Sequence, residues 1–123
     1  MRQATEQIFH LTSEPGYLYK TMADHLMERI ANGELPPQMP LPAEGEISRQ
    51  YGVSLGTTRL ATQLLRQRGL VMTLRSKGTY PVKNSKKIAL WFLQRKRDDP
   101  EQELADFLSF IEQRSKGTDA EAN

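Results

Sequence analysis

The chain contains no cysteine and only two histidines, His10 and His25, among its 123 residues. Without thiols it has neither a disulfide framework nor a thiolate metal site. The two histidines lie too far apart in sequence to suggest a shared metal ion, so we expect no cofactor and no metal site. A glycine-rich phosphate loop after a strand is also missing. An enzyme is therefore the least favoured class of protein.

Long apolar runs are missing as well. No stretch approaches the roughly 18 apolar residues that a membrane-spanning helix needs. The first residues, MRQATEQIFH, lack the apolar centre of a signal peptide. We therefore expect a cytoplasmic protein. A chain of 123 residues corresponds to about one domain, since domains commonly have roughly 100–200 residues.

Charge is unevenly distributed, although the formal net value is only +2. Residues 1–40 carry three basic and five acidic side chains, whereas residues 41–83 carry seven basic and two acidic. Residues 84–97 add five basic side chains, and residues 98–123 carry two basic and eight acidic. A basic central segment is what contact with nucleic-acid phosphates requires. The alternative interpretation of this segment is an ordinary solvated surface.

The segment Leu41–Val82 has the order of elements of a winged helix-turn-helix. Helical patterns over Ala43–Tyr51 and from the N-cap Ser54 to about Arg68 are separated by a short turn at Gly52. Two strand-like runs then surround Ser76-Lys77-Gly78 and predict a hairpin, over Leu70–Arg75 and Thr79–Lys83, with Pro81 in an edge position. In such a fold one helix enters the DNA major groove.

A further helix is predicted before this segment, over Tyr17–Asn32. Its apolar residues recur every four positions, at Leu18, Met22, Leu26 and Ile30. We interpret its methionines as core residues and His25, which lies off the stripe, as a surface histidine.

Two helices are predicted after the hairpin. Ser85–Lys96 is almost continuously apolar in its centre, which indicates burial on two faces. Asp99 as N-cap and Pro100 then begin a last helix that ends near Ser115–Gly117. The expected fold is α+β and mainly helical: a leader at 1–16, a winged helix-turn-helix at 17–83, a two-helix dimerisation extension at 84–116 and a disordered tail at 117–123.

Tyr19 to Val82 resembles the DNA-binding domain of GntR-family bacterial transcription regulators, over about half of the chain. The matching landmarks are Tyr19, Ile30, Gly33, Leu35, Pro37, Leu41-Pro42-Ala43-Glu44, Gly52-Val53-Ser54, Thr57, Arg59, Ala61, Leu64, Gly69-Leu70-Val71 and Gly78-Thr79. The short extension is similar to that of YtrA-like members, which have no large effector domain.

The resemblance implies which residues bind DNA. Ser54, Thr57 and Arg59 match positions at the start of the recognition helix that meet DNA, and Lys77 with Gly78 matches the wing tip. Hydroxyl groups can bind phosphates or base edges, and arginine can bind guanine with two hydrogen bonds. The complete expected set is Ser54, Leu55, Thr57, Thr58, Arg59, Arg75, Lys77, Gly78 and Thr79.

This chain departs from the family pattern at two positions near the expected DNA surface. Gly45 and Leu55 stand where the family usually has basic residues, of which the second is an arginine. An apolar Leu55 can instead meet a thymine methyl group. Glu44 matches an acidic position at the start of a helix and suits the helix dipole, so we interpret it as structural.

The extension predicts a homodimer, because a dense apolar run on a lone helix exposes a patch of the kind found at interfaces. The alternative is that the run packs only on its own domain. The expected dimer residues are Ile88, Trp91, Phe92, Leu104, Phe107, Leu108 and Ile111. The basic cluster Gln94-Arg95-Lys96-Arg97 has two open interpretations: a phosphate grip, or the favourable placement of cations at a helix C-terminus.

Together these features predict a sequence-specific, DNA-binding transcriptional regulator, a repressor that acts as a dimer on a pseudo-palindromic operator in double-stranded DNA. Two other classes stay open: a plasmid or phage DNA-organising factor, and a winged helix that binds another protein. The sequence specifies no small-molecule effector.

Overall fold

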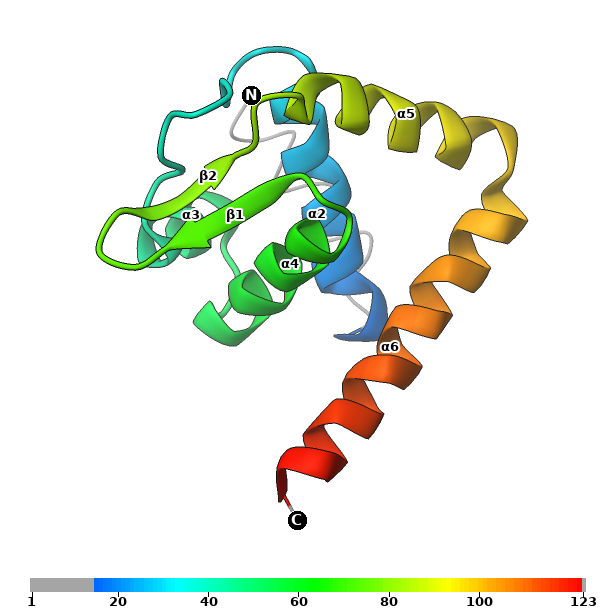
Figure 1. Ribbon diagram of the computed structural model, residues 1–123. Helices are drawn as coiled ribbons and strands as arrows, with labels where there is room; N and C mark the ends of the chain where they lie inside the picture. The colour runs from blue at the N-terminus through cyan, green and yellow to red at the C-terminus, as the bar shows by residue number, and fades with distance from the viewer. Residues whose placement is uncertain (1–14, 123) are drawn as a thin grey trace.

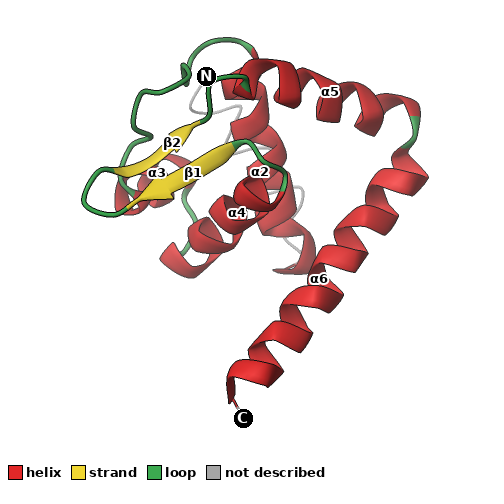
Figure 2. Cartoon of the chain, viewed as in Figure 1, coloured by secondary structure: helices red, strands yellow, loops and turns green. Residues whose placement is uncertain are grey.

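The computed structural model describes residues 15–122, with side chains from residue 18 to residue 114. The backbone follows the order expected for a winged helix-turn-helix with two additional helices (Figure 1, Figure 2). The elements are α2 (Pro15–Ala31), α3 (Glu44–Tyr51), α4 (Leu55–Gln67), β1 (Val71–Leu74), β2 (Gly78–Pro81), α5 (Ser85–Asp98) and α6 (Pro100–Ala122). The mainly helical α+β fold predicted from the sequence is therefore confirmed. The expected leader lies largely outside the described residues.

Helix α2 forms the centre of the core. Met22, Leu26, Met27 and Ile30 are each no more than 1% exposed, which confirms the methionines as core residues. Helices α4 and α5 pack against α2, and their innermost side chains are the small Ala61 and Ala89 together with the larger apolar residues of α4. Small residues let helix backbones approach closely, so the packing holds α4 with its opposite face toward solvent.

The hairpin β1–β2 is antiparallel, with Val71 opposite Pro81 and Leu74 opposite Gly78. Ser76 and Gly78 have positive φ angles of 65° and 91°, which the tight turn between the strands requires. On its other edge β2 is covered by the loop before α3: the Gln38 amide donates to the Pro81 carbonyl at 2.9 Å. A proline fits this edge because it has no amide hydrogen to offer.

Helix α5 lies across one end of α2, and α6 turns back from it at a steep angle (Figure 1). Helix α6 packs on the domain through Phe107, whose ring centroid lies 5.6 Å from that of Tyr19. The helix continues through Gly117 to Ala122, so its expected end near Ser115–Gly117 and the expected disorder of the tail are wrong. A glycine in a helix interior costs only about 1 kcal/mol relative to alanine, so it does not by itself end a helix.

His25 is not a surface histidine. Its side chain is half-buried, and Nδ1 lies 2.7 Å from the hydroxyl oxygen of Tyr51 on α3. The two rings meet edge to face, with centroids 5.3 Å apart. Partial burial lowers the pKa of His25 below its ordinary value of 6.5. The residue therefore joins α2 to α3.

Within the part of the chain that the structure describes, no helix is long and apolar enough to cross a membrane. The same residues contain no cluster of three or more histidine and acidic side chains that would hold a metal ion.

Candidate nucleic-acid interface

The start of α4 is shaped by the turn that follows α3. Gly52 ends α3 in the left-handed conformation, at φ 67°. Ser54 then caps α4: its backbone is extended, and its Oγ accepts a hydrogen bond from the Thr57 amide at 3.1 Å. Such a cap satisfies one of the amide groups that a helix leaves without an internal partner. The predicted cap is thereby confirmed, and the first turn of α4 is held in place.

One face of α4 is open to solvent along its length. Leu55 is 40% exposed, the Arg59 side chain is 64% exposed, and Gln63 and Arg66 are exposed further along. Their spacing of three or four residues places them on one side of the helix. Gln63 and Arg66 were not among the expected DNA-binding residues, although the same periodicity would have identified them. Amide and guanidinium groups are the side chains that commonly read base edges.

Thr58, an expected DNA-binding residue, is completely buried. Its Oγ1 lies 2.8 Å from Ser48 Oγ on α3 and donates to the Ser54 carbonyl at 3.2 Å. It therefore connects the two helices of the helix-turn-helix and is not available to DNA. The residue precedes the buried Ala61 by three positions and Leu65 by seven, so it belongs to the inward face of α4. The spacing from Ala61 and Leu65 therefore indicates that Thr58 is a core residue.

Arg59 is paired across the motif with Glu44. Its Nε lies 3.4 Å from Glu44 Oε1, at the first residue of α3, and both side chains are substantially exposed. Exposed pairs of this kind contribute little to stability, commonly below about 1 kcal/mol. Their effect is to orient the side chains. Glu44 therefore has a place at the candidate interface in addition to its position at the start of a helix.

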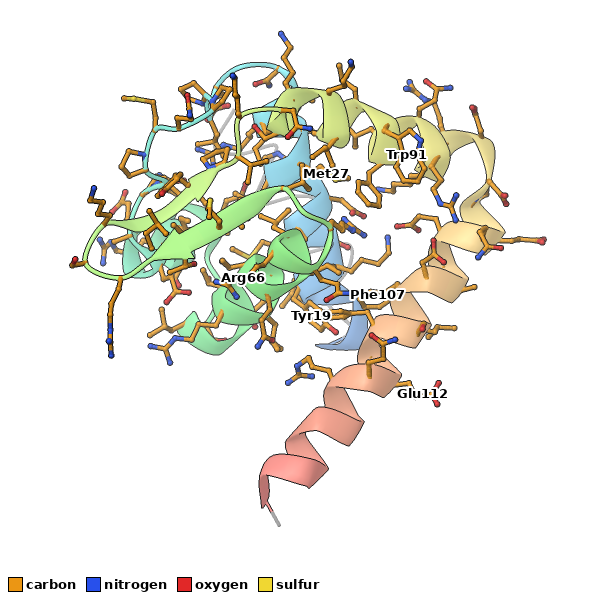
Figure 3. All side chains as sticks on the ribbon, viewed as in Figure 1. Tyr19, Met27, Arg66, Trp91, Phe107 and Glu112 are labelled. Carbon is orange, nitrogen blue, oxygen red and sulfur yellow. The ribbon has the colours of Figure 1, made fainter. Side chains whose placement is uncertain are left out.

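The wing carries two exposed basic residues, Arg75 and Lys77, at the turn beside the exposed Gly78. Thr79 is half-buried, and its hydroxyl lies 2.7 Å from that of Thr73. Thr73 in turn accepts a hydrogen bond from Arg66 at 2.9 Å. Figure 3 labels Arg66 on α4, beside the hairpin. This chain of polar contacts joins the recognition helix to the wing, so the two predicted DNA-binding segments are held together.

The structure leaves room for a side chain at Gly45. A Cβ atom built there would have as its nearest neighbour Arg49 NH1, at 3.8 Å, so the fold does not require glycine. Arg49 itself is 73% exposed and pairs with Glu46 at 2.7 Å. The guanidinium of Arg49 therefore lies next to the place where the side chain of a basic residue at position 45 would begin.

The basic cluster at the end of α5 is largely engaged within the molecule. Lys96 Nζ lies 3.1 Å from Asp24 Oδ2, and Arg95 pairs with Asp106 of α6 at 2.8 Å. These contacts favour the interpretation of the cluster as a cationic helix end over that of a phosphate grip.

The residues expected at a dimer surface divide into two groups. Phe107 is only 2% exposed and packs in the core of its own domain, so its assignment to the dimer surface is wrong. Ile88, Phe92 and Ile111 are partly buried against the same core. The remaining exposed set consists of Trp91, Leu104 and Leu108, together with Leu90 from the same apolar run of α5.

Residues 18–80 match the family described as bacterial regulatory proteins, gntR family. The chain belongs to the GntR family. The match covers the helix-turn-helix and the hairpin as far as Tyr80, including every expected DNA-binding residue. The description of the family as regulatory proteins agrees with the prediction that this chain is a DNA-binding regulator and not an enzyme.

Two curated relatives are named as repressors. The transcriptional repressor NagR of Bacillus subtilis (strain 168) is 40% identical over 73 residues, which are 59% of this chain and 30% of NagR. The mannosyl-D-glycerate transport/metabolism system repressor MngR of Escherichia coli (strain K12) is 38% identical over 63 residues, 51% of this chain and 26% of MngR. The chain thus matches less than a third of the length of these relatives.

Solved structures share the fold over most of the chain. A transcriptional regulator from Oenococcus oeni has a TM-score of 0.59 at 20% identity, covering 86% of this chain and 91% of that one. Streptococcal BusR (S. agalactiae), solved in complex with its busAB-promotor DNA, has a TM-score of 0.59 at 23% identity, covering 85% of this chain and 49% of BusR. At these identities the similarity concerns the fold alone.

Proposed function

We propose that this GntR-family chain is a sequence-specific DNA-binding transcriptional regulator that represses by occupying a promoter. The observation that carries the proposal is the open face of α4, where Leu55, Arg59, Gln63 and Arg66 lie in one row. A capped helix with such a row, beside a basic wing, has the composition and exposure needed to enter a major groove. The repressor names of NagR and MngR support the direction of regulation.

The DNA-binding set that we propose differs from the sequence-based one. It retains Ser54, Leu55, Thr57, Arg59, Arg75, Lys77, Gly78 and Thr79, omits Thr58, and adds Gln63, Arg66 and Arg49. Arg59 and Gln63 are placed to read bases, whereas the wing residues and Arg49 are placed for phosphate contacts, which position a protein without specifying sequence.

We further propose a homodimer formed through α5 and α6. Leu90 and Trp91 of α5 and Leu104 and Leu108 of α6 are between 37% and 56% exposed, so both helices carry apolar side chains that their own domain leaves uncovered. A second copy would bury this surface and place two recognition helices on a pseudo-palindromic site, with half-sites about one helical turn apart.

The decisive test is a gel-shift titration of the purified protein on the DNA upstream of its own gene, with random DNA as competitor and salt varied from about 50 to 200 mM. We expect a shifted complex that resists random competitor. A complex that random DNA removes equally well would favour a DNA-organising factor, for which the loss of basic residues at Gly45 and Leu55 is the supporting observation. No complex even at low salt would favour a protein-binding module.

A further inference from the structure

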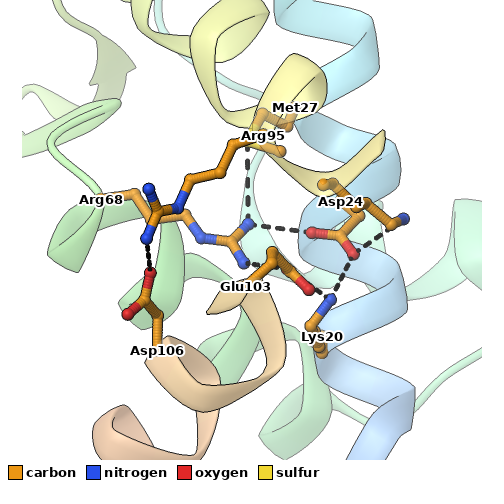
Figure 4. A network of polar contacts seen from close by, with 8 residues as sticks. Lys20, Asp24, Met27, Arg68, Arg95, Glu103 and Asp106 are labelled. Carbon is orange, nitrogen blue, oxygen red and sulfur yellow. Dashed lines mark hydrogen bonds and ion pairs between the residues drawn. The ribbon is translucent and has the colours of Figure 1, made fainter. Parts of the chain in front are cut away.

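A closed group of buried charges joins the C-terminal helix α6 to the helix-turn-helix. It consists of Lys20 and Asp24 of α2, Arg68 at the end of α4 and Glu103 of α6 (Figure 4). None of the four side chains is more than 11% exposed. Charges so well removed from water are costly unless each one is paired. Here every member has at least two partners of opposite sign, and Asp24 has a third in Lys96 of α5.

The four side chains form a ring. Lys20 Nζ lies 2.9 Å from Asp24 Oδ2 and 2.7 Å from Glu103 Oε1. The guanidinium of Arg68 closes the ring from the other side: NH1 lies 2.9 Å from Asp24 Oδ1, and NH2 lies 3.4 Å from Glu103 Oε1. A planar guanidinium binds carboxylates in fixed directions, so the ring constrains the orientation of the helices that carry its members.

Arg68 gives the ring its connection to DNA recognition. It is the C-cap residue of α4, directly after the last helical residue, Gln67. The same guanidinium lies 5.4 Å above the ring centroid of Phe92 on α5. The end of the recognition helix is thus held by α2, α5 and α6 through one side chain.

The apolar contacts of α6 do not impose an orientation of this kind. Phe107 packs on Tyr19, but hydrophobic contact is non-directional. Another ion pair of α6, Arg95–Asp106, joins it to α5. The polar contacts of Glu103, by contrast, reach both Lys20 of α2 and Arg68 at the end of α4.

We infer that Glu103 is a positioning residue which, through Arg68, sets the angle between α6 and the recognition helix. In this way it sets the half-site spacing that the dimer accepts. The inference depends on the proposed function, because spacing has meaning only for a dimer on DNA. One added base pair moves a half-site by about 3.4 Å and rotates it by about 34° around the helix axis. A dimer with fixed arms therefore tolerates few spacings, and one with loosened arms tolerates more.

The test compares the full-length chain, Glu103→Gln and Asp106→Asn on DNA series that differ only in the spacer between two selected half-sites. Both substitutions remove one negative charge from α6, three residues apart. Asp106 is 53% exposed and does not contact the helix-turn-helix in any ion pair described for it. Glutamine keeps the shape of Glu103, and Lys20 and Arg68 keep Asp24 as a partner, so we expect a less stable chain that still folds. Circular dichroism, sedimentation and binding to a single half-site are measured in parallel.

We expect the parent chain and Asp106→Asn to prefer one spacer by roughly tenfold or more over a spacer two base pairs longer. For Glu103→Gln that preference should fall below about threefold, with unchanged affinity for a single half-site. An unchanged preference in folded, dimeric Glu103→Gln would overturn the inference. If the parent chain itself neither dimerises nor binds DNA, the proposed function fails instead, and the two failures are thereby distinguished.

Discussion

At the scale of single residues, the neighbouring threonines of α4 have opposite environments. Thr58 is completely buried, whereas Thr57 is half-exposed beside the cap residue Ser54. The hydroxyl group of Thr58 therefore joins two helices, whereas the hydroxyl group of Thr57 is available to DNA.

We expect Thr58→Val to lower the free energy of unfolding by about 1 kcal/mol, because a buried hydroxyl loses its hydrogen bonds to Ser48 and to the Ser54 carbonyl. DNA affinity of the folded protein should not change. Thr57→Val is the matched control: it should weaken DNA binding and leave stability nearly unaltered. Urea denaturation and gel-shift titration measure the two quantities, and the opposite pattern would contradict the assignment of the two faces.

Arg59 is the residue of α4 best placed to discriminate between bases, because its guanidinium is exposed and already oriented by Glu44. We expect Arg59→Ala to cost about 1–3 kcal/mol of binding free energy on the specific site and to relax the preference at one base position. A selection from randomised sites followed by titration would reveal both effects.

Arg97→Ala supplies the control for Arg59, since it removes the same charge from an exposed position at the end of α5. This variant should retain the base preference of the parent chain. If Arg59→Ala retains it as well, α4 is not inserted in the groove as proposed.

At the scale of the elements, Asp24 lies where α2, α4 and α5 meet. Burial by itself raises the pKa of Asp24, but the charges of Arg68, Lys20 and Lys96 outweigh that effect and hold the pKa below its ordinary value of 3.8. The ionised carboxylate therefore stabilises the fold fully above about pH 4, near the pKa of the unfolded chain. The contribution is lost as the pH falls through the pKa of the folded state.

We expect Asp24→Asn to lower the free energy of unfolding by about 3 kcal/mol at pH 7, because it removes one partner from a buried ionic group. The difference from the parent chain should narrow as the pH is lowered from about 4 toward 2. Urea denaturation at several pH values measures it. Asp98→Asn, at an exposed residue of α5, should show neither effect, and a difference for Asp24→Asn that does not depend on pH would contradict the role of its charge.

At the scale of the whole molecule, helices α5 and α6 carry two kinds of apolar side chain. Some pack on the core of their own domain, and others are exposed and available to a second copy. Trp91 is 56% exposed on α5, with its ring 4.8 Å from that of Phe92. We expect Trp91→Glu to yield folded monomers in sedimentation experiments, because a charge would then lie in the apolar interface. Binding to a two-half-site operator should weaken accordingly.

Met39→Glu tests whether any exposed apolar residue has the same effect. Met39 is 58% exposed in the loop before α3, away from the extension. We expect this variant to remain dimeric. Dimers of Trp91→Glu that are as stable as those of the parent chain would remove the case for an interface on α5 and α6.

Most element bounds were predictable because their signals are local. The apolar spacing of α2, the Ser54 cap and the turn at Gly52 each depend on residues within one or two helical turns. The end of α6 was not predictable in this way. A glycine usually marks a helix end, yet the helix continues past Gly117 to Ala122.

The sequence by itself determined the order of the elements, the family and the cap of the recognition helix, because periodicity and caps are read along the chain. Only the tertiary structure decided which members of each pattern are buried. His25 meets Tyr51, 26 positions away, and Glu103 meets Arg68, 35 positions away. Phe107 is covered by Tyr19 of α2. Partners so distant in sequence come together only when the chain folds, and the burial they create assigns each side chain to the core or to the surface.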